Sequence, residues 1–149
     1  MTTTERRTTR TEDLDPELTE VSRKVIGAAI EVHKTLGPGF TLDVYRAALG
    51  RELDAEGVGY TTDHIVPVEY KGAGVGELTL DLFVNNRFTV QLMNERREID
   101  GLDRTSLRAR LRASNLELGL IINFAERRLK DGLVRVLNPD MLGDTEHES

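Results

Sequence analysis

Cysteine is absent from the 149-residue chain, and this absence excludes several kinds of chemistry at once. Disulfide bonds, a thiol nucleophile and a cysteine-ligated zinc site are all impossible without it. A chain without cysteine suits a reducing compartment. We therefore expect a cytoplasmic protein.

Long apolar runs are also missing. No stretch approaches the roughly 20 apolar residues that a membrane-spanning helix needs, so we expect no membrane partner. The first 15 residues, MTTTERRTTRTEDLD, contain no apolar core of the kind that a secretory signal has. We expect residues 1–15 to form a flexible N-terminal arm, because almost nothing in them can be buried.

Basic residues are outnumbered, with 20 Lys and Arg against 26 Asp and Glu, which gives a formal net charge of −6. Proteins that bind phosphate backbones usually carry the opposite sign, so the charge balance argues mildly against nucleic acid. The length suits one domain with a sizeable core.

Helical periodicity is present near the N-terminus. Apolar residues at helical spacing predict a first helix from about residue 16, with Asp15 as its N-cap and Pro16 at its first position. Gly37-Pro38-Gly39 ends this helix, and a second one is predicted at about 42–56.

Alternating or β-branched runs then predict strands at about 60–70, 77–84, 87–93, 116–124 and 129–138. A helix at about 103–114 separates the third strand from the fourth. A glycine-rich turn at 72–76 and the Asn85-Asn86 pair join the first three strands. The predicted order is α-α-β-β-β-α-β-β, an α/β (α+β) domain over residues 16–138, followed by an acidic C-terminal tail at 139–149.

Four segments carry a resemblance to a known family: GAAIEVHKTLGPGF (27–40), Tyr45, LTLDLFV (78–84) and GLIINF (119–124). Together with the element order, they resemble the GxxExxY protein family of the PD-(D/E)XK nuclease-like superfamily. The resemblance covers about residues 17–138. It implies a mixed central β-sheet flanked by helices, with a metal site on the hairpin within residues 81–96.

The resemblance also implies where the active positions should lie. The seven family positions that can be placed on this chain fall on Leu42, Tyr45, Asp81, Gln91, Met93, Ser106 and Arg110. Only Tyr45 and Asp81 keep the residue type that the family has. The family's Glu is replaced by Leu42, its Glu-x-Lys by Gln91 and Met93, and its Gln and Tyr on the later helix by Ser106 and Arg110.

These replacements remove the chemistry of a metal-dependent nuclease. Mg²⁺ needs hard oxygen ligands in near-octahedral geometry, and Asp81 alone supplies one carboxylate. Gln91 offers only a neutral carbonyl oxygen, and Met93 can neither donate a proton nor stabilise negative charge. The sequence therefore predicts a catalytically inactive nuclease fold with no catalytic residues, no metal and no cofactor; Mg²⁺ would be needed only if activity were retained.

One alternative is a metal-dependent nuclease whose catalytic residues have moved, because active positions migrate within this superfamily. The charged residues considered as replacements are Glu31, Glu69, Lys71, Glu77 and Glu95.

Another alternative is a nucleic-acid-binding module. Arg104, Arg108 and Arg112 are spaced to line one face of the predicted helix. Three interpretations are open for this arginine stripe: a solvated face, a subunit interface, or a patch that binds phosphates.

The leading interpretation is a structural or interaction protein that associates with itself into a homo-oligomer or larger assembly. Leu42 and Met93 place apolar side chains where the family has charge. If the cleft around these two residues stays open, it forms an apolar patch, and such patches usually mark a binding surface for a protein partner.

Overall fold

The computed structural model describes residues 15–141. The expected N-terminal arm, apart from Asp15, and the expected tail beyond residue 141 lie outside the described residues. The chain forms helices and strands in the order α2 (Pro16–Leu36), α3 (Leu42–Ala55), β1 (Tyr60–Tyr70), β2 (Ala73–Val84), β3 (Phe88–Met93), α4 (Gly101–Ser114), β4 (Leu118–Asn123), η1 (Leu129–Gly132) and β5 (Leu133–Leu137). This order confirms the prediction, apart from the short 3₁₀-helix η1.

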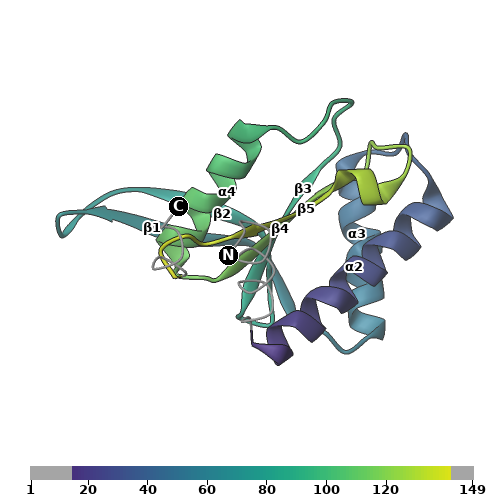
Figure 1. Ribbon diagram of the computed structural model, residues 1–149. Helices are drawn as coiled ribbons and strands as arrows, with labels where there is room; N and C mark the ends of the chain where they lie inside the picture. Colours follow the sequence, from purple (N-terminus) through teal and green to yellow (C-terminus); the bar gives the residue numbers. More distant parts are fainter. Residues whose placement is uncertain (1–14, 142–149) are drawn as a thin grey trace, which may run out of the picture.

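All five strands form one sheet in the order β1-β2-β3-β4-β5 (Figure 1). The pair β3–β4 is parallel, and the other three pairs are antiparallel. The sheet is therefore mixed, and the predicted α+β fold class is confirmed. None of the helices within residues 15–141 is both long and apolar enough to cross a membrane.

Two buried clusters cover opposite faces of the sheet. Along β3, Val90 and Leu92 belong to the cluster that includes residues of α2 and α3, whereas Met93 packs against the cluster that includes residues of α4. In β4, Leu120 belongs to the first cluster and Ile121 to the second. Because neighbouring residues of a strand point to opposite faces, α2 and α3 cover one face and α4 covers the other.

The start of α2 follows its sequence signals. The Asp15 side chain accepts a hydrogen bond from the Glu17 N–H at 2.8 Å, and Pro16 occupies the first turn. Arg87, beside the β2–β3 turn, forms ion pairs with Asp15 and Glu17, each at 3.3 Å. The helix ends at Gly37, whose φ of 73° is the left-handed conformation that glycine adopts without strain.

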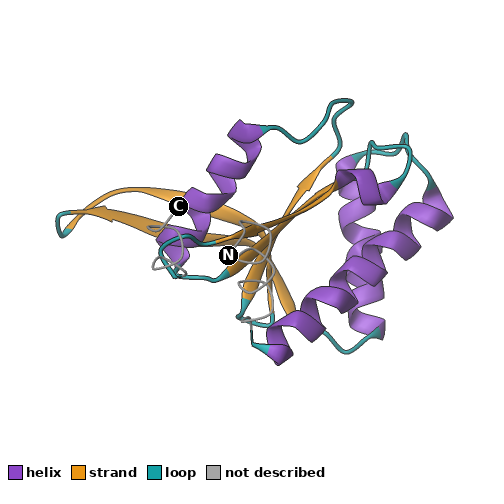
Figure 2. Cartoon of the chain, viewed as in Figure 1, coloured by secondary structure: helices purple, strands orange, loops and turns teal. Residues whose placement is uncertain are grey.

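The hairpin of β1 and β2 is longer than predicted. The glycine-rich run at 72–76 was expected to be a turn, but β2 begins at Ala73. Only Lys71 and Gly72 make the turn, and both have positive φ, 51° and 84°. Two such residues form a tight turn whose twist matches that of the strands, so the pairing continues almost to the tip. The result is a long two-stranded ribbon whose outer half projects from the domain (Figure 2).

The last predicted strand is shorter than expected. Leu129–Gly132 forms η1, and the strand starts only at Leu133. Leu129 is buried in the cluster on the α2–α3 face, and the Asp131 N–H donates to the Arg128 carbonyl at 3.0 Å. The chain turns to bury this leucine before it joins the sheet edge.

Candidate functional site

Asp81 lies where β2 and β3 separate. The antiparallel ladder pairs Leu82 with Val90 and does not continue to the next position, Asp81 opposite Gln91. Two side chains bridge the gap instead. The Leu92 N–H donates to Asp81 Oδ2 at 2.9 Å, and the Asp81 N–H donates to Gln91 Oε1 at 3.1 Å. Asp81 and Gln91 thus replace the missing backbone bonds.

The course of β2 changes at the same point. Leu80 and Phe83 both pack against the cluster on the α4 face, although Leu82 lies in the cluster on the opposite face. A regular strand would place Leu80 and Leu82 on the same face. Asp63, which the register places opposite Asp81, has a φ of 52°. This local irregularity lets the Asp81 side chain reach the neighbouring strand.

Three of the family positions meet at a small cavity of about 110 Å³ between the sheet and α4. The cavity is lined by Gln91, Leu92, Met93, Asp103, Ser106, Leu107 and Ile121. The structure therefore brings Gln91, Met93 and Ser106 together and sets them close to Asp81 on β2.

Ser106 borders the small cavity, and its hydroxyl is bound by Arg110 one turn further along α4. Arg110 donates to the Ser106 hydroxyl at 2.6 Å and to the Thr79 carbonyl at 2.9 Å. The bond to Thr79 ties α4 to β2. Arg110, at a position where the resemblance implied Tyr, therefore helps to hold the helix on the sheet, and Ser106 orients its guanidinium.

Asp103 is a cavity residue that the sequence analysis missed. Arg97 donates to both of its carboxylate oxygens, at 2.7 and 3.0 Å. The Asp103 carboxylate also accepts from the Asp100 N–H at 2.9 Å, and the Asp103 N–H donates back to Asp100, which makes a capping box at the start of α4. The hydrogen bonds from Arg97 lower the pKa of Asp103, so this acid stays ionised with its oxygens engaged. The spacing of Asp100 and Asp103 before an amphipathic run was the signal that could have found it.

Leu42 does not share a cleft with Met93. Leu42 packs against the buried cluster on the α2–α3 face, whereas Met93 packs against the cluster on the α4 face. The expected apolar cleft around both residues is therefore wrong. Each side chain is half-buried against the core layer on its own side of the sheet.

Tyr45 is fully buried and holds the Gly37-Pro38-Gly39 loop. Its hydroxyl donates to the Gly37 carbonyl and accepts from the Phe40 N–H at 3.2 Å. Its ring stacks on Phe124, with ring centroids 4.6 Å apart and planes 3° from parallel. These contacts give Tyr45 a structural role that does not depend on catalysis.

The charged residues considered as relocated ligands lie away from the cavity. Glu69, Lys71 and Glu77 are exposed on the outer half of the β1–β2 ribbon. Glu95 is paired with Arg97 at 2.8 Å, and Glu31 borders a hollow between α2 and α3. Within residues 15–141, no three His, Asp or Glu side chains gather in a way that could hold a metal ion. One carboxylate, one neutral amide and a thioether do not fit Mg²⁺.

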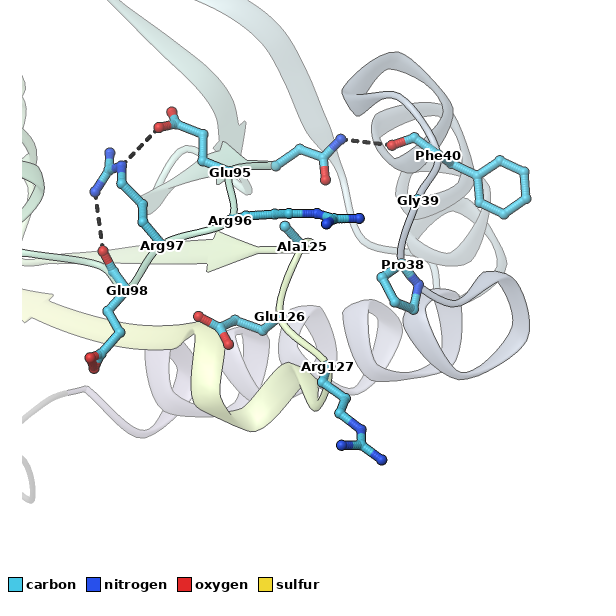
Figure 3. A pocket seen from close by; sticks show the side chains of 11 residues that line it. Pro38, Gly39, Phe40, Glu95, Arg96, Arg97, Glu98, Ala125, Glu126 and Arg127 are labelled. Carbon is cyan, nitrogen blue, oxygen red and sulfur yellow. Dashed lines mark hydrogen bonds and ion pairs between the residues drawn. The ribbon is translucent and has the colours of Figure 1, made fainter.

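A wider pocket of about 640 Å³ lies where the parallel strands β3 and β4 end (Figure 3). Its walls are the loop at 38–40 and the segments 94–98 and 125–127. The buried Asn123 side chain makes hydrogen bonds of 2.9–3.2 Å to the backbone of Glu95, Arg97 and Ala125. These bonds fix two walls against each other, so the pocket is preformed.

The charges around this pocket cancel. Three arginines and three glutamates line it: Arg96, Arg97, Arg127, Glu95, Glu98 and Glu126. Figure 3 shows the Arg96 side chain crossing the pocket and the pair of Glu95 with Arg97 at its edge. A site for a phosphate backbone needs an excess of positive charge, and this lining has none.

The arginine stripe of α4 is partly used within the chain. Arg104 donates to the Ile99 carbonyl at 3.3 Å. Arg112 pairs with Asp140 at 3.4 Å, with both side chains more than half exposed. Arg108 forms no ion pair with any residue in the range 15–141.

The chain has a mixed sheet, a helical layer on each face, and an acid, Asp81, where β2 and β3 separate. These features define a class, the α+β domains built like metal-dependent nucleases. A model of the PD-(D/E)XK nuclease superfamily matches residues 19–136, so the chain belongs to this superfamily. Searches of curated proteins and of solved structures each found no match.

Proposed function

We propose that this protein is a catalytically inactive member of the superfamily that serves as a structural or interaction protein and associates with itself. The proposal rests on the hydrogen bonds at the point where β2 and β3 separate. Its one acid, Asp81, accepts a backbone hydrogen bond from Leu92, and Gln91 accepts one from Asp81. The groups that would bind a metal instead close the sheet.

The surroundings of Asp81 support the same conclusion. Met93 packs against the core on the α4 face, where the family's lysine would have to reach the attacking water. Asp103, the one carboxylate among the residues that line the small cavity, has both oxygens bound by Arg97. A hydrolytic site needs free ligand oxygens and a group that activates water, and these residues supply neither.

We further propose that the chain derives from the GxxExxY group of this superfamily. Tyr45 supports this, because its hydroxyl holds the loop that carries the first half of the motif. Leu42 stands at the glutamate position and packs into the core. The motif thus keeps its structural residue and has exchanged its catalytic one for packing.

A cleavage assay tests the loss of activity. The purified protein is incubated with single- and double-stranded DNA and with RNA, in the presence of Mg²⁺ or Mn²⁺. We expect no cleavage above that of Asp81→Ala purified in the same way. Metal-dependent cleavage that disappears in Asp81→Ala would contradict the proposal.

A restoration experiment tests whether this fold can still form the metal site of the superfamily. Gln91→Glu combined with Met93→Lys returns two of the family's charged groups to the strand beside Asp81. We expect this variant to gain Mg²⁺ binding in calorimetry, and Asp81→Asn in the same background to lose it. Absence of binding in the folded double variant would argue that the frame no longer supports a metal site.

The alternative is a nucleic-acid-binding module that uses the exposed side of α4. Its support is the shared face of Arg104, Arg108 and Arg112, none of which is buried. It predicts binding that weakens steeply with salt and in the triple Arg→Gln variant. No binding at low salt would exclude it.

A further inference from the structure

The two segments that follow the parallel strands β3 and β4 repeat the same charged sequence. Residues 95–97 and 126–128 both read Glu-Arg-Arg, and both segments contribute to the wider pocket. Crevices at the carboxyl ends of parallel strands are common ligand sites. The volume of about 640 Å³ is typical of sites for small molecules. The pocket shares no lining residue with the small cavity beneath α4.

Side chains from outside the pocket hold the backbone of its walls. His33 of α2 donates from Nε2 to the Glu126 carbonyl at 2.8 Å. The Asn94 amide donates to the Phe40 carbonyl at 2.7 Å and fixes the loop at 38–40. Together with the bonds of Asn123, these contacts hold all three walls. A preformed pocket of this kind binds a ligand without a large cost of ordering.

The charged side chains of the pocket are used unequally. Arg97 is held by acids on both sides, and Arg127 points away from the pocket (Figure 3). Arg96, Glu98 and Glu126 form no ion pair with any residue in the range 15–141. In Figure 3 the Arg96 side chain runs toward the loop at 38–40, and Glu126 runs the opposite way, toward Glu98. The pocket therefore has a positive end beside this loop and a negative end beside Glu98.

We propose that this pocket binds a short free peptide of about two to four residues. The peptide's carboxylate pairs with the Arg96 guanidinium, and its ammonium lies near Glu98 and Glu126. A single α-amino acid carries both charges on one carbon and cannot reach both ends, whereas an extended tripeptide spans about 10 Å. The proposal is independent of the loss of catalysis and of self-association.

A titration followed by nuclear magnetic resonance tests the proposal on the full chain. Trialanine should cause saturable shifts confined to residues 38–40, 94–98 and 125–127, with a Kd on the order of 0.1–1 mM. Trialanine amide lacks the carboxylate, and N-acetyl-trialanine lacks the ammonium. Each of these capped peptides should bind about tenfold more weakly than trialanine.

Two variants assign each end of the peptide to its partner. Arg96→Gln should weaken trialanine binding about tenfold and leave the affinity for trialanine amide unchanged, because the contact is already lost. Glu98→Gln combined with Glu126→Gln should do the same for trialanine and N-acetyl-trialanine. Arg108→Gln on α4 removes the same charge as Arg96→Gln outside the pocket and should leave every affinity unchanged.

Several results would overturn the proposal. One is the absence of saturable shifts with trialanine, and another is equal binding of the free and capped peptides. A loss on capping that adds to the loss in the matching variant would show that the assigned contacts are wrong. Inorganic phosphate that binds as tightly as trialanine would mean a simple anion site. Equal binding of 6-aminohexanoate, which has both charges but no peptide groups, would exclude a peptide as the specific ligand.

Discussion

The two faces of the sheet differ in what they contain. The buried cluster on the α2–α3 face has 19 residues, all apolar or aromatic, whereas the cluster on the α4 face has eight. Gln91 and Met93 on β3 and Ser106 on α4, which the resemblance places at active positions, lie on the smaller side, at the cavity beneath α4. The residues at these positions therefore contribute little to the main core. Most of the buried apolar surface lies on the other face.

Packing on the α4 face relies more on hydrogen bonds and on one close contact between α4 and β4. Asn138 donates to the carbonyls of Leu111 and Leu116, at 3.2 and 2.9 Å, and holds the end of α4 against β5. Gly119 in β4 leaves room for the Leu107 side chain. Helix α4 is thus positioned by a few specific groups, while α2 and α3 are held by a broad apolar core.

The largest effect is expected on the α2–α3 face. Phe124→Ala removes a fully buried ring that stacks on Tyr45 and should cost about 3–5 kcal/mol in the free energy of unfolding. Met93→Ala on the α4 face removes a half-buried side chain and should cost about 1–2 kcal/mol. Urea titration measures both. Equal costs would contradict the contrast between the faces.

The contact between Leu107 of α4 and Gly119 of β4 gives a second test of how the two faces differ. A Cβ atom at residue 119 would lie 2.9–3.0 Å from the Leu107 side chain, so Gly119→Ala should destabilise the protein by about 1–3 kcal/mol. Gly27→Ala in α2 is the matched control, because nothing lies within 4 Å of its Cβ. That change should stabilise the protein by about 0.5–1 kcal/mol. If Gly119→Ala and Gly27→Ala both raise the free energy of unfolding, Leu107 does not pack as tightly against β4 as the structure shows.

Removal of the Asp81 side chain distinguishes a structural from a functional acid. Asp81→Ala leaves the Leu92 N–H without its acceptor in a buried position and should cost about 1–3 kcal/mol. Asp81→Asn keeps an oxygen that can accept this bond and should cost less. An active-site acid held for catalysis commonly behaves in the opposite way, because its removal relieves strain. A more stable Asp81→Ala in thermal unfolding would therefore restore the case for a working site.

Much of the fold could be predicted from local signals. Asp15 and Pro16 mark the start of α2, and Gly37 its end, because capping depends on a few neighbouring residues. The glycine-rich run at 72–76 misled the prediction. Glycine is unfavourable in strands by itself, but here the facing residues of β1 supply hydrogen-bonding partners that a local pattern does not reveal.

The site was predictable in position but not in its contacts. Gln91, Met93 and Ser106 do line one cavity. The separation of Leu42 from Met93 depends on which face each element covers, and this is decided by tertiary packing. The bond from Leu92 to Asp81 depends on the ladder ending one residue early, which no spacing in the sequence encodes.

The smallest expected effect concerns acid stability on the α4 face. Hydrogen bonds from Arg97 lower the pKa of Asp103 below its ordinary value of 3.8, so the folded state binds fewer protons there than the unfolded state. This acid therefore stabilises the fold fully above the ordinary value, and the contribution is lost as the pH falls further. In Asp103→Asn the contribution is absent, so its stability should differ from wild type at neutral pH and approach it in acid. Asp43→Asn, an exposed change on α3, should stay within about 0.5 kcal/mol of wild type throughout. A difference between Asp103→Asn and wild type that is independent of pH in urea titrations would mean that the ion pair to Arg97 does not hold α4 in solution.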